Sequence, residues 1–145
     1  MIKKITVQQK FDRPVADVFD LLSKHATYNQ MFFPIQVVRV KDAQDAQRPD
    51  GLGSVRRMGL GPIKPLQEEI ITLQENALIE YKIINNPLVK HHLGRLVFES
   101  LAQDVTRVTY TIEFQGKLPL SSLLVLSQLK LVVGVGMAKL AKRMR

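Results

Sequence analysis

Two pairs of adjacent charged residues are the side chains of this sequence best suited to chemistry. Arg56 and Arg57 are consecutive, and Glu68 and Glu69 are consecutive in the next expected strand. Successive side chains of a strand point to opposite faces, so each pair sends one charge to each side of a sheet. An arginine on the inner side would suit a carboxylate or phosphate better than a neutral group.

The pattern does not say which member of each pair faces inward. One arginine and one glutamate could pair inside the molecule and hold a polar end of a ligand. Alternatively, the pairs could meet across strands on the solvated face, which is the commoner arrangement because buried charges are rare. We take Arg57 and Glu69 as the candidates for the inner position.

The histidines do not have the spacing of metal ligands. His91 and His92 are adjacent, so a regular strand would point them in opposite directions. No His-x-x-x-His or Glu-x-x-His spacing involves either of them or His25, so we expect no metal site. His92 shares its strand parity with Phe98 and could face the interior, although a solvated or hydrogen-bonded histidine at a strand end is commoner.

No nucleophile stands in a recognisable arrangement. No serine lies in a nucleophile elbow, and no Ser-His-Asp set follows from the spacing. Acid–base catalysis stays open, because it needs only a positioned acid or base in an apolar pocket. The residues that could supply it are Glu68, Glu69, His92, Tyr81 and Tyr110.

Gly134 and Gly136 lie inside a predicted helix with no strand before it, so they do not form a dinucleotide-binding loop, and we expect no cofactor. Two glycines inside a helix cost about 2 kcal/mol relative to alanine. We expect close packing of the helix on a sheet to offset this cost, although a kink or room for a ligand would also require small residues here.

The positions of apolar residues predict the elements that hold these side chains. One short helix opens at Pro14, and a second covers residues 26–32 and ends before Pro34. Short connections between the later strands imply an antiparallel meander with helices packed on one face. The strands are expected at residues 2–11, 35–41, 54–60, 66–75, 78–85, 92–102 and 106–115.

The last segment, residues 118–145, is predicted to be a long helix. Its first half is apolar around nearly its whole circumference, so it must be buried on more than one side or face a ligand, membrane or partner. A lysine near the middle of a membrane span costs roughly 2.5–3.5 kcal/mol, so Lys130 favours a buried helix over a span. We expect part of the surface between Leu120 and Val135 to stay exposed and to contact a second copy or a membrane.

Composition is typical of one basic domain, residues 1–145. The absence of cysteine excludes disulfides and thiolate chemistry, and the alternating first residues favour the cytoplasm over secretion. The net charge of +8 indicates attraction to anionic partners, or a soluble basic protein without such a partner. Residues 139–145 contain no aromatic side chain, so nucleic acid is an unlikely partner.

The order of segments resembles the START-like superfamily, also called SRPBCC, and within it the polyketide cyclase/dehydrase-like group. That family often has tryptophan after the first helix and in the late strands, where this chain has Tyr28, Phe32, Phe33 and Tyr110. The segments that carry the resemblance are FDRPVADVFDLL, GLGSVRRMGLG, QEEIITLQENALIEYKI, NNPLVKHHLGRLVFE and DVTRVTYTIEF, before the closing helix.

The resemblance implies an α+β helix-grip fold, in which a curved antiparallel sheet of about six or seven strands wraps a long C-terminal helix. It also implies an internal cavity that binds a lipid, polyketide or other apolar molecule, for transport or sensing. The alternatives are a cyclase or dehydratase acting on a polyketide-like substrate, and a basic module that binds anionic membrane or RNA. The candidate cavity residues are Phe19, Phe32, Arg57, Glu69, Tyr81, His92, Phe98, Tyr110, Val132 and Gly136.

Overall fold

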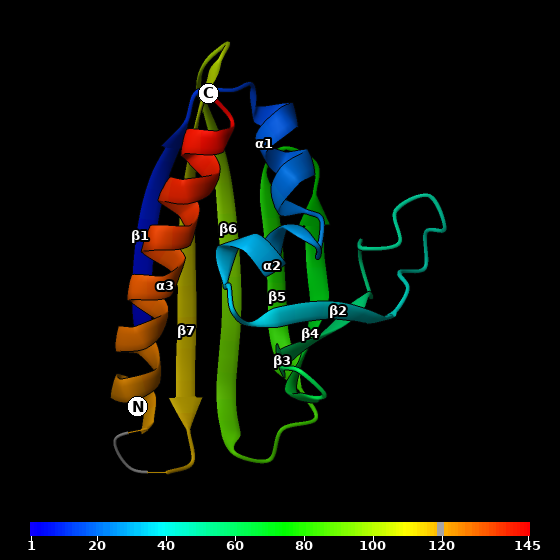
Figure 1. Cartoon of the computed structure of the whole chain (residues 1–145), viewed down its shortest axis with the longest axis vertical. Helices are drawn as coiled ribbons and strands as arrows, with labels where there is room; N and C mark the ends of the chain where they lie inside the picture. Colours follow the sequence, from blue (N-terminus) through cyan, green and yellow to red (C-terminus); the bar gives the residue numbers. More distant parts are fainter. Residues whose placement is uncertain (119–120) are drawn as a thin grey trace.

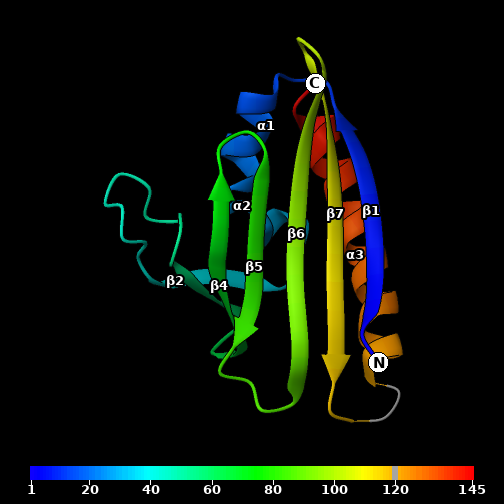
Figure 2. The ribbon, with the colours of Figure 1, turned by 180° about the vertical axis from the view of Figure 1, so that it is seen from behind.

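The computed structural model describes the backbone of residues 1–118 and 121–145, and the side chains of residues 1–118 and 126–145. Its strands form one antiparallel sheet in the order β1-β7-β6-β5-β4-β3-β2. The helices lie on one face of this sheet (Figure 1), and the opposite face is uncovered (Figure 2). The predicted α+β helix-grip architecture is confirmed. The elements are β1 (Lys3–Phe11), α1 (Val15–Leu22), α2 (Thr27–Met31), β2 (Gln36–Lys41), β3 (Val55–Leu60), β4 (Ile63–Gln74), β5 (Leu78–Ile84), β6 (Val89–Ala102), β7 (Val105–Gly116) and α3 (Ser121–Arg143).

Two strands begin earlier than the sequence predicts. Leu60 of β3 pairs with Ile63 of β4, so only Gly61 and Pro62 connect these strands. Gly61 has a positive φ of 55°, a conformation that glycine adopts without a steric penalty. Similarly, β6 begins at Val89 because this residue pairs with the end of β7. Cross-strand pairing therefore extends both strands beyond their apolar alternation.

The core lies between the sheet and the helices. Alternate residues of β7 are buried, as expected for a strand with one covered face. Phe19 of α1 meets Phe98 of β6 edge-on, with ring centroids 5.0 Å apart. Five aromatic rings of this core are buried: Phe19, Tyr81, Phe98, Tyr110 and Phe114.

The two glycines of α3 have different surroundings. A Cβ atom at Gly136 would lie 2.4 Å from the carbonyl oxygen of Met31 in α2, whereas a Cβ atom at Gly134 would meet nothing within 4 Å. The expectation that these glycines allow close packing on the sheet was therefore wrong, because the close neighbour of Gly136 is a helix. Gly136 lets α3 and α2 approach each other.

The outward side of α3 is partly apolar. Leu131, Val132 and Val135 are exposed, while Val133 and Met137 are buried. Residues 119–125, which include Leu120, lie outside the described side chains. Of the helices that the structure describes, none has both the length and the apolar character needed to cross a bilayer.

Candidate functional site

A buried ion pair lies on the inner face of the sheet, where β3 pairs with β4. Arg56 and Glu68 are directly opposite each other in the antiparallel register. The Arg56 Nε–H donates a hydrogen bond of 2.9 Å to Glu68 Oε1. Only 1% of the Arg56 surface is exposed. A charge this deeply buried is tolerated only when it is paired.

One nitrogen of this guanidinium has no good hydrogen bond. Arg56 Nη2 lies 2.9 Å from the same carboxylate oxygen, Glu68 Oε1. Its geometry is unsuited to hydrogen bonding, and Nη2 has no hydrogen-bond partner among the described residues. Buried polar atoms are normally satisfied by hydrogen bonds, so Nη2, which is held by the charge of Glu68 alone, departs from that rule.

Tyrosine rings enclose the guanidinium. The Arg56 Cζ atom lies 4.3 Å from the ring centroid of Tyr28 and 4.8 Å from that of Tyr81. A cation over the face of an aromatic ring is attracted by its quadrupole. The hydroxyl groups of Tyr81 and Tyr110 also hydrogen-bond each other. Arg56, Glu68 and these three tyrosines, with His92, form what we call the arginine cluster.

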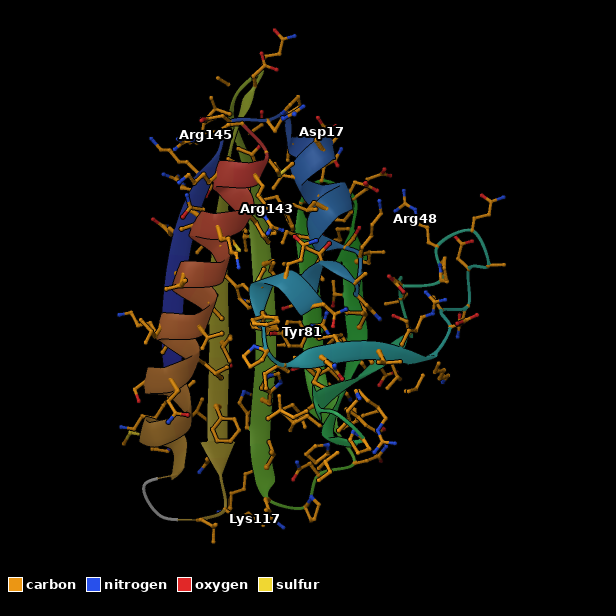
Figure 3. All side chains as sticks on the ribbon, viewed as in Figure 1. Asp17, Arg48, Tyr81, Lys117, Arg143 and Arg145 are labelled. Atoms are coloured by element: carbon orange, nitrogen blue, oxygen red, sulfur yellow. The ribbon has the colours of Figure 1, made fainter. Side chains whose placement is uncertain are left out.

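Gly94 makes room for the central tyrosine. Tyr81 of β5 lies opposite Gly94 of β6, near the middle of the molecule (Figure 3). A Cβ atom at Gly94 would lie 2.1 Å from the Tyr81 ring, so any larger residue there would displace the ring. The missing side chain lets Tyr81 lie across β6 and reach Tyr110 on β7.

His92 stands at the edge of the cluster as a neutral ring. Its centroid lies 5.4 Å from that of Tyr81, and the Ile83 N–H donates to His92 Nδ1 at 3.0 Å. Burial lowers the pKa of His92, and the Glu68 carboxylate opposes this only in part. Since Nδ1 accepts, the proton of the neutral ring is on Nε2.

In the arginine cluster, Arg56 is positively charged and the tyrosine phenols are neutral. Burial alone would lower the pKa of Arg56, but the Glu68 carboxylate and the nearby tyrosines raise it above its ordinary value. Burial raises the pKa of Tyr28 to about 12 and the pKa values of Tyr81 and Tyr110 well above their ordinary range. At neutral pH these phenols are therefore protonated donors beside a fixed positive charge.

A second buried polar group, the histidine cluster, consists of His25, Asp50 and Ser54. Ser54 Oγ lies 3.2 Å from His25 Nε2, and His25 Nδ1 lies 3.6 Å from Asp50 Oδ1. This is the order of a Ser-His-Asp triad, which the sequence spacing did not indicate. However, Ser54 is 0% exposed, and His25 Nδ1 has no hydrogen-bond partner among the described residues. The serine is shielded from solvent in this closed arrangement, and we interpret the cluster as structural.

Asp50 is shared among several donors. It accepts the His25 backbone N–H at 2.8 Å and a guanidinium hydrogen bond from Arg39 at 2.5 Å. Burial opposes its ionisation, but the bonds from Arg39 and the His25 backbone lower the pKa of Asp50 overall. Burial and the Arg56 charge lower the pKa of His25 to about 4. His25 is therefore neutral at pH 7.

The structure corrects three of the predicted site residues. Arg57 is exposed and its Nε–H donates to the Lys64 carbonyl, while Glu69 lies on the other face from Glu68 because of strand alternation. Pairing of the charges on the solvated face was also wrong, since Arg56 and Glu68 pair inside. Val132 is 38% exposed, so it is not enclosed in the interior.

The other predicted residues are covered by the fold, but they do not form one site. Tyr81, His92 and Tyr110 join the arginine cluster. Gly136 packs against α2. The remaining three, Phe19, Phe32 and Phe98, are buried in the apolar core.

The two clusters enclose one small space that has about 0 Å³ of free volume. A cleft of about 380 Å³ adjoins it, between α1, the loop before β3 and the β4–β5 turn. Ser23, Asp50 and Leu73 line both, so these residues form the wall between the cleft and the interior.

A curved antiparallel sheet closed by one long helix defines the helix-grip class of ligand-binding folds. A family model described as "Polyketide cyclase / dehydrase and lipid transport" matches residues 3–145, and the chain belongs to this family. The resemblance noted from the sequence is thereby confirmed. No curated protein matches the chain significantly.

Solved structures support the same fold. The chain is similar to the Zhui aromatase/cyclase from Streptomyces sp. R1128, with a TM-score of 0.76, 16% identity, and coverage of 99% of this chain and 95% of that chain. It is similar to norcoclaurine synthase from Thalictrum flavum in complex with dopamine and hydroxybenzaldehyde, with a TM-score of 0.69, 15% identity, and coverage of 100% of this chain and 89% of that chain. It is also similar to a START superfamily protein from Mycobacterium smegmatis, with a TM-score of 0.69, 17% identity, and coverage of 96% of this chain and 92% of that chain. At these identities the likeness shows the fold alone.

Proposed function

We propose that this protein binds an apolar small molecule between the sheet and the helices, and that Arg56 anchors an oxygen-rich end of that molecule. The observation that carries the proposal is the buried guanidinium whose Nη2 has no hydrogen-bond partner among the described residues. A cation is expensive to bury. A ligand oxygen on Nη2 would complete its hydrogen bonding.

The surroundings favour a particular class of ligand. A planar guanidinium donates best to a carboxylate or to a pair of oxygens, and the rings of Tyr28 and Tyr81 would pack against a flat or apolar body. Ligand sites usually combine such an apolar lining with a few placed polar groups. The family description, which covers polyketide cyclisation and lipid transport, agrees with an apolar ligand.

Binding requires the interior to open, because the space around Arg56 has about 0 Å³ of free volume. The adjoining cleft suggests a route. Moving the wall formed by Ser23, Asp50 and Leu73 would connect the cleft with the arginine cluster. A ligand would replace the side chains that now fill the space.

The test compares ligands that differ only at the polar end. Oleate is titrated against methyl oleate, and 1,8-dihydroxyanthraquinone against its dimethyl ether, while native mass spectrometry examines molecules that co-purify with the protein. We expect oleate to bind at least about tenfold more tightly than methyl oleate, because one charge-assisted hydrogen bond contributes roughly 1.5–3 kcal/mol. The dihydroxyanthraquinone and its dimethyl ether should differ little, since a guanidinium only donates and both compounds offer neutral acceptor oxygens.

The control variant is Arg56→Met/Glu68→Gln, which removes both charges and leaves neither partner alone. It should bind the ester and the acid equally. The proposal fails if no probe binds at tens of micromolar and nothing co-purifies, or if the double variant keeps the preference for the acid.

A cyclase or dehydratase is the second candidate. The observation that favours it is a fixed cation next to the paired hydroxyls of Tyr81 and Tyr110. A guanidinium stabilises a developing enolate, and a neutral phenol can donate a proton to it. A poly-β-ketone thioester analogue tests this by mass spectrometry. An enzyme would give a product lighter by one water molecule, or about 18 mass units. This product should form when Tyr110 is intact and should not form with Tyr110→Phe.

The proposed partners follow from these two candidate functions and from the exposed helix. The first is the apolar ligand. The second is a contact through the outward side of α3, with another copy of the chain or with an anionic membrane. A cytoplasmic location stays a prediction.

A further inference from the structure

The outward side of α3 combines exposed apolar residues with lysines. Leu131 is 69% exposed and Val135 is 61% exposed. Both lie on the side opposite the buried Val133 and Met137, as the 3.6-residue period requires. Lys139 and Lys142 continue this side toward the C-terminus and are exposed. We call Leu131, Val135, Lys139 and Lys142 the α3 surface.

No acidic side chain balances these charges along the helix. Glu113 is the last carboxylate side chain in the sequence. Neither lysine of the α3 surface takes part in an ion pair among the described residues, while Arg145 lies 3.7 Å from Asp12. The acidic residues near this end belong to other elements, such as Asp17 on the neighbouring α1 (Figure 3).

We propose that the α3 surface docks on an anionic membrane. Leu131 and Val135 enter the boundary between headgroups and acyl chains, and the lysines contact acidic lipid headgroups. At such a surface the burial of apolar side chains and the attraction of lysines to acidic headgroups both favour binding. A free phosphate would use the lysines but would give Leu131 and Val135 no apolar environment.

The charges disfavour a second copy of the chain as the occupant. A two-fold interface brings the same surface of both subunits together, which would place lysines against lysines without a carboxylate on either helix. Among the α3 side chains that the structure describes, residues 126–145, the large exposed apolar ones are Leu131, Val132 and Val135, which are few for an interface that normally buries about 800 Å² per partner. A flat anionic surface matches both the charge and the small apolar area.

Flotation of the full chain with vesicles tests this inference independently of the ligand proposal. We expect the protein to float with phosphatidylcholine vesicles containing about 30% phosphatidylserine at low salt. It should not float with phosphatidylcholine alone. Raising the salt to about 500 mM should release it, because screening shortens the range of the lysine charges.

Two matched double variants locate the contact. Lys139→Gln/Lys142→Gln should weaken binding by about 25-fold, since each near-surface lysine contributes a factor of about five. Lys82→Gln/Lys90→Gln removes the same charge from exposed strand positions and should leave binding nearly unchanged. Leu131→Ser/Val135→Ser should weaken binding at low salt although it keeps every charge. Circular dichroism verifies that each variant is folded.

Each alternative has a distinct outcome that would overturn the inference. Equal losses in both lysine variants would mean that net charge alone attracts the protein. A dimer in sedimentation that Leu131→Ser/Val135→Ser dissociates, with no flotation, would assign the surface to a second copy. Binding to an RNA duplex but not to vesicles would assign it to nucleic acid, and no binding at low salt would leave the surface without this role.

Discussion

The two buried polar clusters lie around one small space, yet their charges end in opposite states, although burial lowers the pKa of both Arg56 and His25. Arg56 stays charged, with its pKa raised, whereas His25 is held neutral, with its pKa lowered to about 4. Glu68 Oε1 is 2.9 Å from the Arg56 guanidinium. The Asp50 carboxylate is 3.6 Å from His25 Nδ1 and is already bonded to Arg39.

At Arg56 the Glu68 carboxylate outweighs the effect of burial, whereas at His25 the Asp50 carboxylate does not, and an arginine also starts from a much higher ordinary pKa than a histidine. A carboxylate committed to one cation does little to stabilise a second. The clusters are also coupled, because the positive charge of Arg56 is one of the causes that lower the pKa of His25. The charge in one cluster thus helps to exclude charge from the other.

Removing Arg56 alone should have the largest effect. Arg56→Met leaves the Glu68 carboxylate buried without its cation, and breaking a buried pair typically costs about 3–5 kcal/mol of unfolding free energy. Arg56→Met/Glu68→Gln removes both charges and should recover most of that loss. Urea unfolding at pH 7 measures both variants. Equal destabilisation of the single and the double variant would contradict the view that the unpaired charge is responsible.

The sequence could predict the general fold because its signals are local. Apolar alternation and turn residues located the strands, and Pro14 located the start of α1. The sequence could not predict that Arg56, rather than Arg57, faces the interior. Register decides that choice, and a shift of one residue reverses the faces of a strand.

The histidine cluster was missed for a related reason. His25, Asp50 and Ser54 come from the α1–α2 connection and from the loop before β3, so only tertiary packing brings them together. A single signal was present: Asp50 and Gly51 mark a turn next to a strand that begins with Ser54. That signal locates the loop but does not indicate that His25 packs against it.

Acid should destabilise the protein through His25. The folded pKa is about 4 and the ordinary value is 6.5, so unfolding takes up a proton between these values. The contribution of His25 to stability is complete above pH 6.5 and falls as the pH drops toward 4. The loss is about 3 kcal/mol, from roughly 1.4 kcal/mol for each pKa unit.

Urea unfolding at a series of pH values measures this slope, and His25→Gln should remove most of it. A smaller slope of the same sign should remain, since burial also lowers the pKa of His92. If His25→Gln keeps the full slope, then the neutral state of His25 is not the cause, and the contrast between the clusters is lost.

Gly94→Ala tests whether the arginine cluster depends on the position of Tyr81. The new methyl group would occupy the place of the Tyr81 ring, and such overpacking typically costs about 1–3 kcal/mol. Gly134→Ala is the matched control, because nothing lies within 4 Å of its Cβ and alanine stabilises a helix interior by about 1 kcal/mol. The midpoint of thermal unfolding should therefore fall in Gly94→Ala and rise in Gly134→Ala. A neutral Gly94→Ala would mean that Tyr81 moves without cost.

The smallest expected effect concerns Ser54, and it tests whether the histidine cluster is structural. Ser54→Ala removes the contact of 3.2 Å with His25 Nε2 and should cost about 1 kcal/mol, the usual net contribution of one hydrogen bond. Ser100→Ala is the control, because the Ser100 hydroxyl bonds at the exposed surface, where loss of a hydrogen bond has little effect on stability. A fluorophosphonate probe should not label the folded protein, because Ser54 is 0% exposed. Labelling that disappears in Ser54→Ala would show instead that the triad order of Ser54, His25 and Asp50 has a chemical use.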